Sequence, residues 1–187
     1  ENTIEEYPNW QVKNETYYKN LTDSVKHLIA NGNKEWKFFK SWSKEDTLKS
    51  KLGDSICVHV LTAGTGSGCP LYNDSVRVHY LLRILPSTSY KDGAIIDRSY
   101  YGSYNLETSI PKTLLVSGLI DGFTTALMNM HIGDRWVVYM PYDLGYGSST
   151  SNVPAYSTLI FDITLAAYYH AGSSVPVWSA KQTRWTE

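Results

Sequence analysis

Four stretches of the chain alternate apolar and polar residues with a period of two. This spacing places every second side chain on the same face of a β-strand, so each stretch predicts a strand with one buried face. The stretches span residues 55–61, 76–85, 135–140 and 158–165. Strands at this density, with turn residues between them, predict an antiparallel sheet.

One segment among these strands follows the helical period instead. Between residues 118 and 130, apolar side chains recur every three or four positions. They are Leu119, Phe123, Ala126, Leu127 and Met130. A lone short amphipathic helix must cover one face of the sheet to bury this stripe. The predicted fold class is therefore α+β, with a curved antiparallel sheet wrapped around one short helix.

A second helix is predicted near the start of the chain, over residues 8–31. Its apolar positions are Trp10, Tyr17, Leu21, Val25, Leu28 and Ile29. The helix is expected to end before Gly32, because glycine and asparagine tolerate left-handed backbone. Four aromatic residues follow within seven positions, at Trp36, Phe38, Phe39 and Trp42. We interpret them as the surface that docks this N-terminal part onto a larger body.

Composition changes along the chain and suggests how it is divided. Residues 1–50 hold almost half of the charged residues, whereas the remainder is richer in Gly, Ser, Thr and Tyr. We predict a helical extension over residues 1–50, a first strand and Gly-rich connector over 51–73, a compact domain over 74–168 and a C-terminal tail over 169–187. The tail carries Trp178 and Trp185, which we expect to pack against the N-terminal helix because tryptophans seldom remain exposed.

Charge and motif content exclude several classes of function. A formal net charge of −1 argues against a nucleic-acid binder, which presents a basic face. No apolar run reaches the length of about 18 residues that a membrane span requires. Cys57 and Cys69 have no further ligand at zinc spacing, so no metal site is predicted. They pair as a disulfide or remain two free thiols; the sequence leaves both open.

Seven short motifs in the second half of the chain resemble, in order and spacing, those of the FKBP-type peptidyl-prolyl cis-trans isomerases. They are Val78-His79-Tyr80, Gly93–Asp97, Leu115–Gly122, Ile132-Gly133-Asp134, Pro141–Gly147, Val153-Pro154-Ala155 and Leu159–Asp162. The resemblance covers residues 74–168. It implies a twisted antiparallel sheet on a short helix, in agreement with the fold predicted from periodicity.

The activity that the resemblance implies is rotation about Xaa-Pro peptide bonds in proline-containing polypeptide clients. Twisting the planar amide costs about 18–20 kcal/mol. An apolar pocket that binds the twisted amide better than either planar form lowers this barrier without nucleophile, metal or cofactor. A non-catalytic domain that holds client proteins in the same groove is the alternative.

The resemblance assigns the site residue by residue. Tyr80, Asp97 and Tyr146 match the catalytic positions: a pocket tyrosine, a pocket acid and a loop hydroxyl donor. Val116 matches a position whose backbone N–H holds a ligand carbonyl. The other substrate-binding positions are Ile96, Leu106, Leu115, Leu119, Val153 and Phe161.

Three of these positions depart from the family pattern. Leu119 stands where the family often has the Trp of the pocket floor, and Ile96 and Leu106 stand at Phe positions. The pocket stays apolar but loses aromatic surface, which predicts a slower isomerase. The N-terminal part is similar to extensions of Gram-negative cell-envelope lipoproteins. That similarity implies a periplasmic or outer-membrane location, with membrane contact only through a lipid anchor upstream of Glu1.

Overall fold

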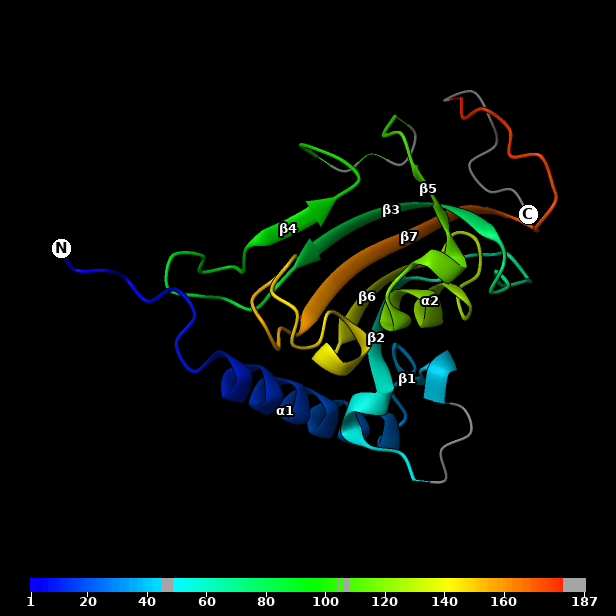
Figure 1. Ribbon diagram of the computed structural model, residues 1–187. Helices are drawn as coiled ribbons and strands as arrows, with labels where there is room; N and C mark the ends of the chain where they lie inside the picture. Colours follow the sequence, from blue (N-terminus) through cyan, green and yellow to red (C-terminus); the bar gives the residue numbers. More distant parts are fainter. Residues whose placement is uncertain (45–48, 104, 106–107, 180–187) are drawn as a thin grey trace.

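The four predicted strands are the longest strands of a single antiparallel sheet (Figure 1). They are β2 (Ser55–Thr62), β3 (Ser75–Arg83), β6 (Arg135–Met140) and β7 (Leu159–Tyr169). The computed structural model describes residues 1–44, 49–103, 105 and 108–179. The sheet has seven strands in the order β1-β2-β6-β7-β3-β4, and β5 also pairs with β3. The predicted α+β fold class is confirmed.

Three short strands were not predicted from the sequence. They are β1 (Trp36–Lys40), β4 (Ile95–Arg98) and β5 (Lys112–Leu115). β1 and β4 lie at the two edges of the sheet, and every second residue of β4 is exposed. Strands that bury little of either face need no apolar alternation, so periodicity does not reveal them.

Helix α2 (Asp121–Leu127) covers the concave side of the sheet, as predicted, but it is shorter than the predicted 118–130 (Figure 1). The chain enters it through a 3₁₀ turn over Val116–Gly118, and Ile120 has extended backbone. Phe123, Ala126 and Leu127 are buried in the main core. Leu119 precedes the helix and is only partly buried, which leaves its side chain at the rim of the core.

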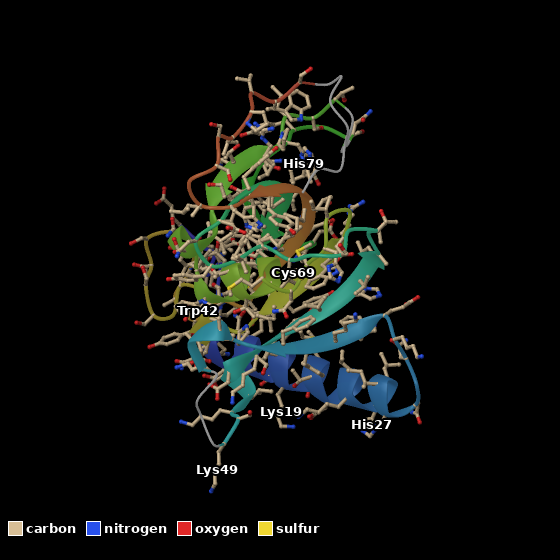
Figure 2. All side chains as sticks on the ribbon, turned by 90° about the vertical axis from the view of Figure 1, so that its right-hand side faces the viewer. Lys19, His27, Trp42, Lys49, Cys69 and His79 are labelled. Atoms are coloured by element: carbon tan, nitrogen blue, oxygen red, sulfur yellow. The ribbon has the colours of Figure 1, made fainter. Side chains whose placement is uncertain are left out.

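Helix α1 (Trp10–Ala30) buries a face that overlaps the predicted one only in part. Its buried residues are Trp10, Asn14, Tyr18, Thr22 and Val25. Trp10 and Val25 are buried as predicted, and Tyr17 and Leu21 are partly buried against the core. Leu28 and Ile29 are 42% and 37% exposed, so their assignment to the buried stripe was wrong. The polar residues on the buried face are hydrogen-bonded, which removes the cost of burying them. Figure 2 shows Lys19 and His27 pointing away from the sheet on the opposite side of this helix.

The aromatic cluster that follows α1 docks the extension, as predicted. The Trp36 ring stacks on His59 with centroids 4.3 Å apart, and Phe39 stacks on Trp136 at 5.4 Å. β1 pairs with β2 throughout its length. Residues 36–40, within the predicted helical extension, are therefore part of the sheet itself.

The C-terminal tail packs on β3 rather than on α1. The Arg77 guanidinium donates a hydrogen bond to the Pro176 carbonyl and lies 5.5 Å from the Tyr169 ring. The tail and α1 are at opposite ends of the molecule (Figures 1 and 2). The prediction that Trp178 packs against the N-terminal helix was wrong; Trp185 lies outside the described residues.

The two cysteines are free thiols. Cys57 is buried in β2, and burial raises its pKa to about 12. Cys69 lies with its Sγ 3.6 Å from His131 Nδ1. In the part of the chain that the structure describes, no helix has the length and apolar character needed to cross a bilayer.

Candidate functional site

A polar triplet joins three strands on the concave face of the sheet. Tyr80 of β3 is almost fully buried, and its hydroxyl donates to Asp97 Oδ2 of β4 at 2.8 Å. Lys112 Nζ of β5 donates to the same hydroxyl at 3.1 Å. Burial is the largest influence on Tyr80 and raises its pKa. The hydroxyl is therefore neutral and fixed between a cation and a carboxylate.

An aromatic floor lies under this triplet. Phe123 of α2 and Phe161 of β7 meet edge-to-face with centroids 5.0 Å apart. The Tyr80 ring contacts both, at 5.8 Å from Phe123 and 6.1 Å from Phe161. The contact with Phe123 is edge-to-face and that with Phe161 is tilted, and together they orient the Tyr80 ring. The Tyr80 backbone N–H is held as well, by Ser99 Oγ at 2.7 Å.

Tyr146 lies beside the triplet on the loop that follows β6. Burial and the charge of Asp97 both raise its pKa, so its hydroxyl remains protonated and near the carboxylate. The next residue, Gly147, accepts a hydrogen bond from the Tyr156 N–H at 2.9 Å. This bond ties the Tyr146 loop to the loop that carries Val153.

The apolar residues assigned to the pocket fall into three groups. Val153 and Phe161 are buried, while Ile96 and Leu119 are partly buried against the same core as Tyr80. Leu115 is 52% exposed at the end of β5. Leu106 lies outside the described residues. Four of the six apolar positions therefore pack against one cluster with Tyr80 and Tyr146.

The structure does not support the role assigned to Val116. Its N–H donates to the Asp74 carbonyl at 3.0 Å, and its own carbonyl accepts from Thr124 Oγ1 at 2.7 Å. Its side chain is fully buried. Asp74, which precedes β3, and Thr124 of α2 therefore satisfy both backbone groups, so the N–H is already occupied.

Two residues of the site were not recognised from the sequence. Lys112 belongs to a short strand without alternation, and nothing in its surroundings predicted contact with Tyr80. Phe123 was assigned only to the buried stripe of the short helix, which is correct but incomplete. Its contact with both Tyr80 and Phe161 follows from how the helix crosses the sheet.

The arrangement suits non-covalent binding of an apolar segment. One face is aromatic and aliphatic, and its few polar groups are a neutral tyrosine, a carboxylate and an ammonium group. Across the described residues, no three His, Cys, Asp or Glu side chains come together as metal ligands would. Fold and site together define a small sheet-and-helix domain in which Tyr80 and Tyr146 border an apolar, aromatic cluster.

Residues 66–166, more than half of the chain, match the FKBP-type peptidyl-prolyl cis-trans isomerase family, and the chain belongs to this family. The Macrophage infectivity potentiator of Trypanosoma cruzi is 33% identical over 124 residues, which are 65% of this chain and 57% of that protein. The FKBP-type 22 kDa peptidyl-prolyl cis-trans isomerase of Escherichia coli (strain K12) is 28% identical over 156 residues, 82% of this chain and 64% of that one. The chain thus spans less than two thirds of the length of these relatives.

Further relatives agree with this assignment. The Outer membrane protein MIP of Legionella longbeachae is 35% identical over 108 residues, 57% of this chain and 41% of that protein. The crystal structure of a peptidyl-prolyl cis-trans isomerase from Pseudomonas syringae superposes with a TM-score of 0.53 at 24% identity, covering 81% of this chain and 96% of that one. FkpA from Escherichia coli gives a TM-score of 0.51 at 25% identity, covering 83% and 62%. Both solved structures support the fold.

Proposed function

We propose that this protein is a peptidyl-prolyl cis-trans isomerase that acts on Xaa-Pro bonds of protein clients. The observation that carries the proposal is the Lys112–Tyr80–Asp97 network fixed on the floor of Phe123 and Phe161. It combines an apolar surface for a proline ring with a few oriented polar groups. Membership of the family supports the same activity.

The chemistry follows from the resonance of the peptide bond. A planar amide carries more charge separation than a twisted one, so an apolar, water-poor pocket favours the twisted form. The neutral Tyr146 hydroxyl is a hydrogen-bond donor for a displaced carbonyl oxygen. Asp97 orients Tyr80 through their hydrogen bond and adds a negative charge at the rim. No bond is broken, so the site needs neither nucleophile nor cofactor.

The first test is exchange NMR on a short Xaa-Pro peptide, with and without the protein. We expect catalysed exchange, a fall in kcat/KM of about tenfold for Tyr146→Phe, and a fall of about 10- to 100-fold for Asp97→Ala. Tyr139→Phe is the matched control, because Tyr139 is another partly buried tyrosine and packs in a separate cluster with Cys57. Peptide binding without catalysed exchange would instead assign the groove to client binding alone.

We also propose that activity is weakened by the aliphatic residue at the pocket rim. Leu119→Trp should raise kcat/KM about tenfold, because the indole adds apolar contact area worth about 1–3 kcal/mol. Leu71→Trp adds the same group at a largely exposed position outside the assigned site and should have little effect. Equal activity of Leu119→Trp and the wild type in the same peptide assay would contradict this explanation.

The relatives support a location in the cell envelope, since one of them is named an outer membrane protein. We propose that the full-length protein is exported to the periplasm or the outer membrane of a Gram-negative bacterium and held there by a lipid anchor. Fractionation of cells that express it, combined with labelling by a fatty-acid analogue, tests both parts. Recovery in the cytoplasmic fraction would contradict export, and an unlabelled exported protein would contradict the anchor.

A further inference from the structure

The first half of α1 is fastened to the two loops that complete the pocket. We infer that Trp10, Asn14 and Glu15 are positioning residues for isomerisation, because they hold the loop over residues 153–158 and the loop over residues 141–147. The first loop carries Val153 and the second carries Tyr146. The inference rests on the proposed function and assigns part of it to the N-terminal helix.

Trp10 holds the Val153 loop through a relay of two hydrogen bonds. Its indole N–H donates to Ser157 Oγ at 2.8 Å, and the Ser157 hydroxyl donates to the Pro154 carbonyl at 2.6 Å. Trp10 and Ser157 are buried, so water does not compete for these bonds. The relay ends at the residue that follows Val153.

Asn14 holds the end of the same loop. Its side chain is fully buried; Oδ1 accepts from the Thr158 N–H at 2.7 Å, and Nδ2 donates to the Trp10 carbonyl at 2.7 Å. A buried amide is tolerated only when it is hydrogen-bonded, so this residue requires the loop to lie against the helix. Thr158 immediately precedes β7, the strand that supplies Phe161.

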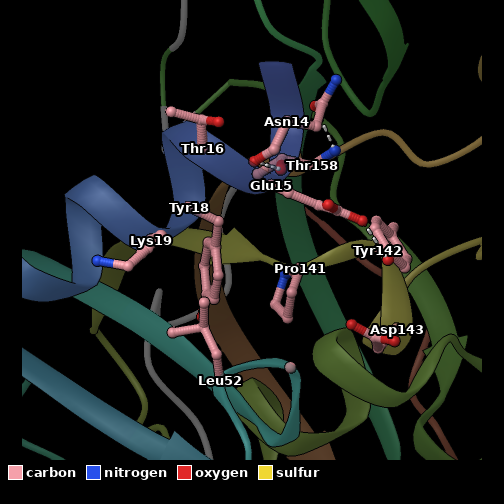
Figure 3. A pocket seen from close by; sticks show the side chains of 11 residues that line it. Asn14, Glu15, Thr16, Tyr18, Lys19, Leu52, Pro141, Tyr142, Asp143 and Thr158 are labelled. Carbon is pink, nitrogen blue, oxygen red and sulfur yellow. Dashed lines mark hydrogen bonds between the residues drawn. The ribbon is translucent and has the colours of Figure 1, made fainter. Parts of the chain in front are cut away.

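Glu15 holds the second loop, through Tyr142. The Tyr142 hydroxyl donates to Glu15 Oε1 at 2.7 Å, as Figure 3 shows. The Tyr142 ring also meets Tyr156 edge-to-face at 5.1 Å, and this contact links the two loops again. Both loops are therefore tied to each other and to consecutive turns of one helix.

Helix α1 and the 141–143 segment are not closely packed against each other. A cavity of about 420 Å³, open to solvent, lies between α1 and the 141–143 segment (Figure 3). Asn14, Glu15, Tyr142 and Asp143 are among the residues that line it. The hydrogen bond from Tyr142 to Glu15 spans this gap, so its loss removes a directional contact between the helix and the loop over residues 141–147.

A small shift of these loops affects the reaction more than the fold. Displacing a binding group by about 1 Å costs up to about 100-fold in rate, because a twisted amide must meet its partners at fixed geometry. Val153 is a wall for the substrate in every state of the reaction, so its displacement raises KM. Tyr146 donates to the displaced carbonyl, so its displacement lowers kcat.

The experiment compares three variants that each delete one hydrogen bond of α1. Trp10→Phe should raise KM for the Xaa-Pro peptide about three- to tenfold, and Tyr142→Phe should lower kcat by a similar factor. Thr22→Val is the matched control: it removes the hydrogen bond of the buried Thr22 hydroxyl to the Tyr18 and Lys19 carbonyls, a bond that stays within α1. It should lower stability while leaving KM and kcat unchanged.

A double-mutant cycle confirms the route through the loop. Ser157→Ala should reproduce the rise in KM, and adding Trp10→Phe to it should change KM no further, because both delete the same relay. If Trp10→Phe and Tyr142→Phe lose only stability, as Thr22→Val does, the inference is overturned and α1 serves stability alone.

The positioning role of α1 can still be tested if the protein does not catalyse isomerisation. In that case NMR titration with the same peptide measures its Kd in place of KM. A weaker Kd for Trp10→Phe and Ser157→Ala, with amide signals of residues 153–158 displaced, supports positioning of a binding groove by α1. An unchanged Kd and unchanged loop signals overturn it.

Discussion

Replacing Phe161 with alanine is expected to lower the free energy of unfolding by about 3–5 kcal/mol and to remove most of the isomerase activity. Phe161 is 4% exposed in β7 and contacts both Phe123 and Tyr80. Its truncation leaves a cavity beneath the Tyr80 ring, which loses one of its two aromatic contacts. The Tyr80 hydroxyl then no longer holds its fixed position between Asp97 and Lys112.

Two measurements on the same variant separate these effects. Urea denaturation followed by tryptophan fluorescence gives the stability, and peptide exchange NMR under folding conditions gives the activity. Leu165→Ala is the control, because Leu165 is fully buried in β7 and pairs with Val78, whereas Ile163 pairs with Tyr80 itself. It should lose about 2–5 kcal/mol yet retain activity while folded. Similar activity in both variants would show that the aromatic floor does not orient the site.

Stability is expected to fall by about 3 kcal/mol as pH drops from 7 to 4, because of His79. His79 is 2% exposed in β3, and burial lowers its pKa from 6.5 to about 4. The unfolded chain binds a proton at this histidine below pH 6.5, whereas the folded protein does not until pH reaches about 4. Protonation therefore favours the unfolded state, and the stabilisation present above pH 6.5 is lost on acidification through this window.

Urea unfolding at several pH values between 4 and 7 measures this dependence. His79→Gln removes the titrating group, so its stability curve should be flatter than that of the wild type by about the same 3 kcal/mol. Comparing the two proteins cancels the contribution of the other acids and histidines. Parallel curves would show that His79 is not the group responsible. Successive residues of a strand point to opposite faces, so His79 points away from Tyr80. Peptide binding by His79→Gln at pH 7 is therefore an independent check that the variant is folded.

Periodicity was sufficient for the parts of the fold that bury one face. The predicted strand over residues 135–140 has the observed bounds of β6, and Phe123, Ala126 and Leu127 of the predicted stripe are buried in α2. Both patterns arise because an element with one face in the core must repeat its apolar residues at its own period. Motif order assigned Tyr80, Asp97 and Tyr146 to a common site; the structure joins Tyr80 to Asp97 by a hydrogen bond and packs Tyr146 against the core cluster that contains Tyr80.

The remaining features depend on partners that are distant in the chain. Asn14 is buried only because Thr158 supplies its hydrogen bond, 144 residues away, and Lys112 joins the site only because β5 pairs beside β3. The Val116 N–H is occupied by Asp74 for the same kind of reason. A local pattern records how strongly a segment is buried. Which polar group meets which is decided when the segments pack, since hydrogen bonds require positions and directions that no single segment contains.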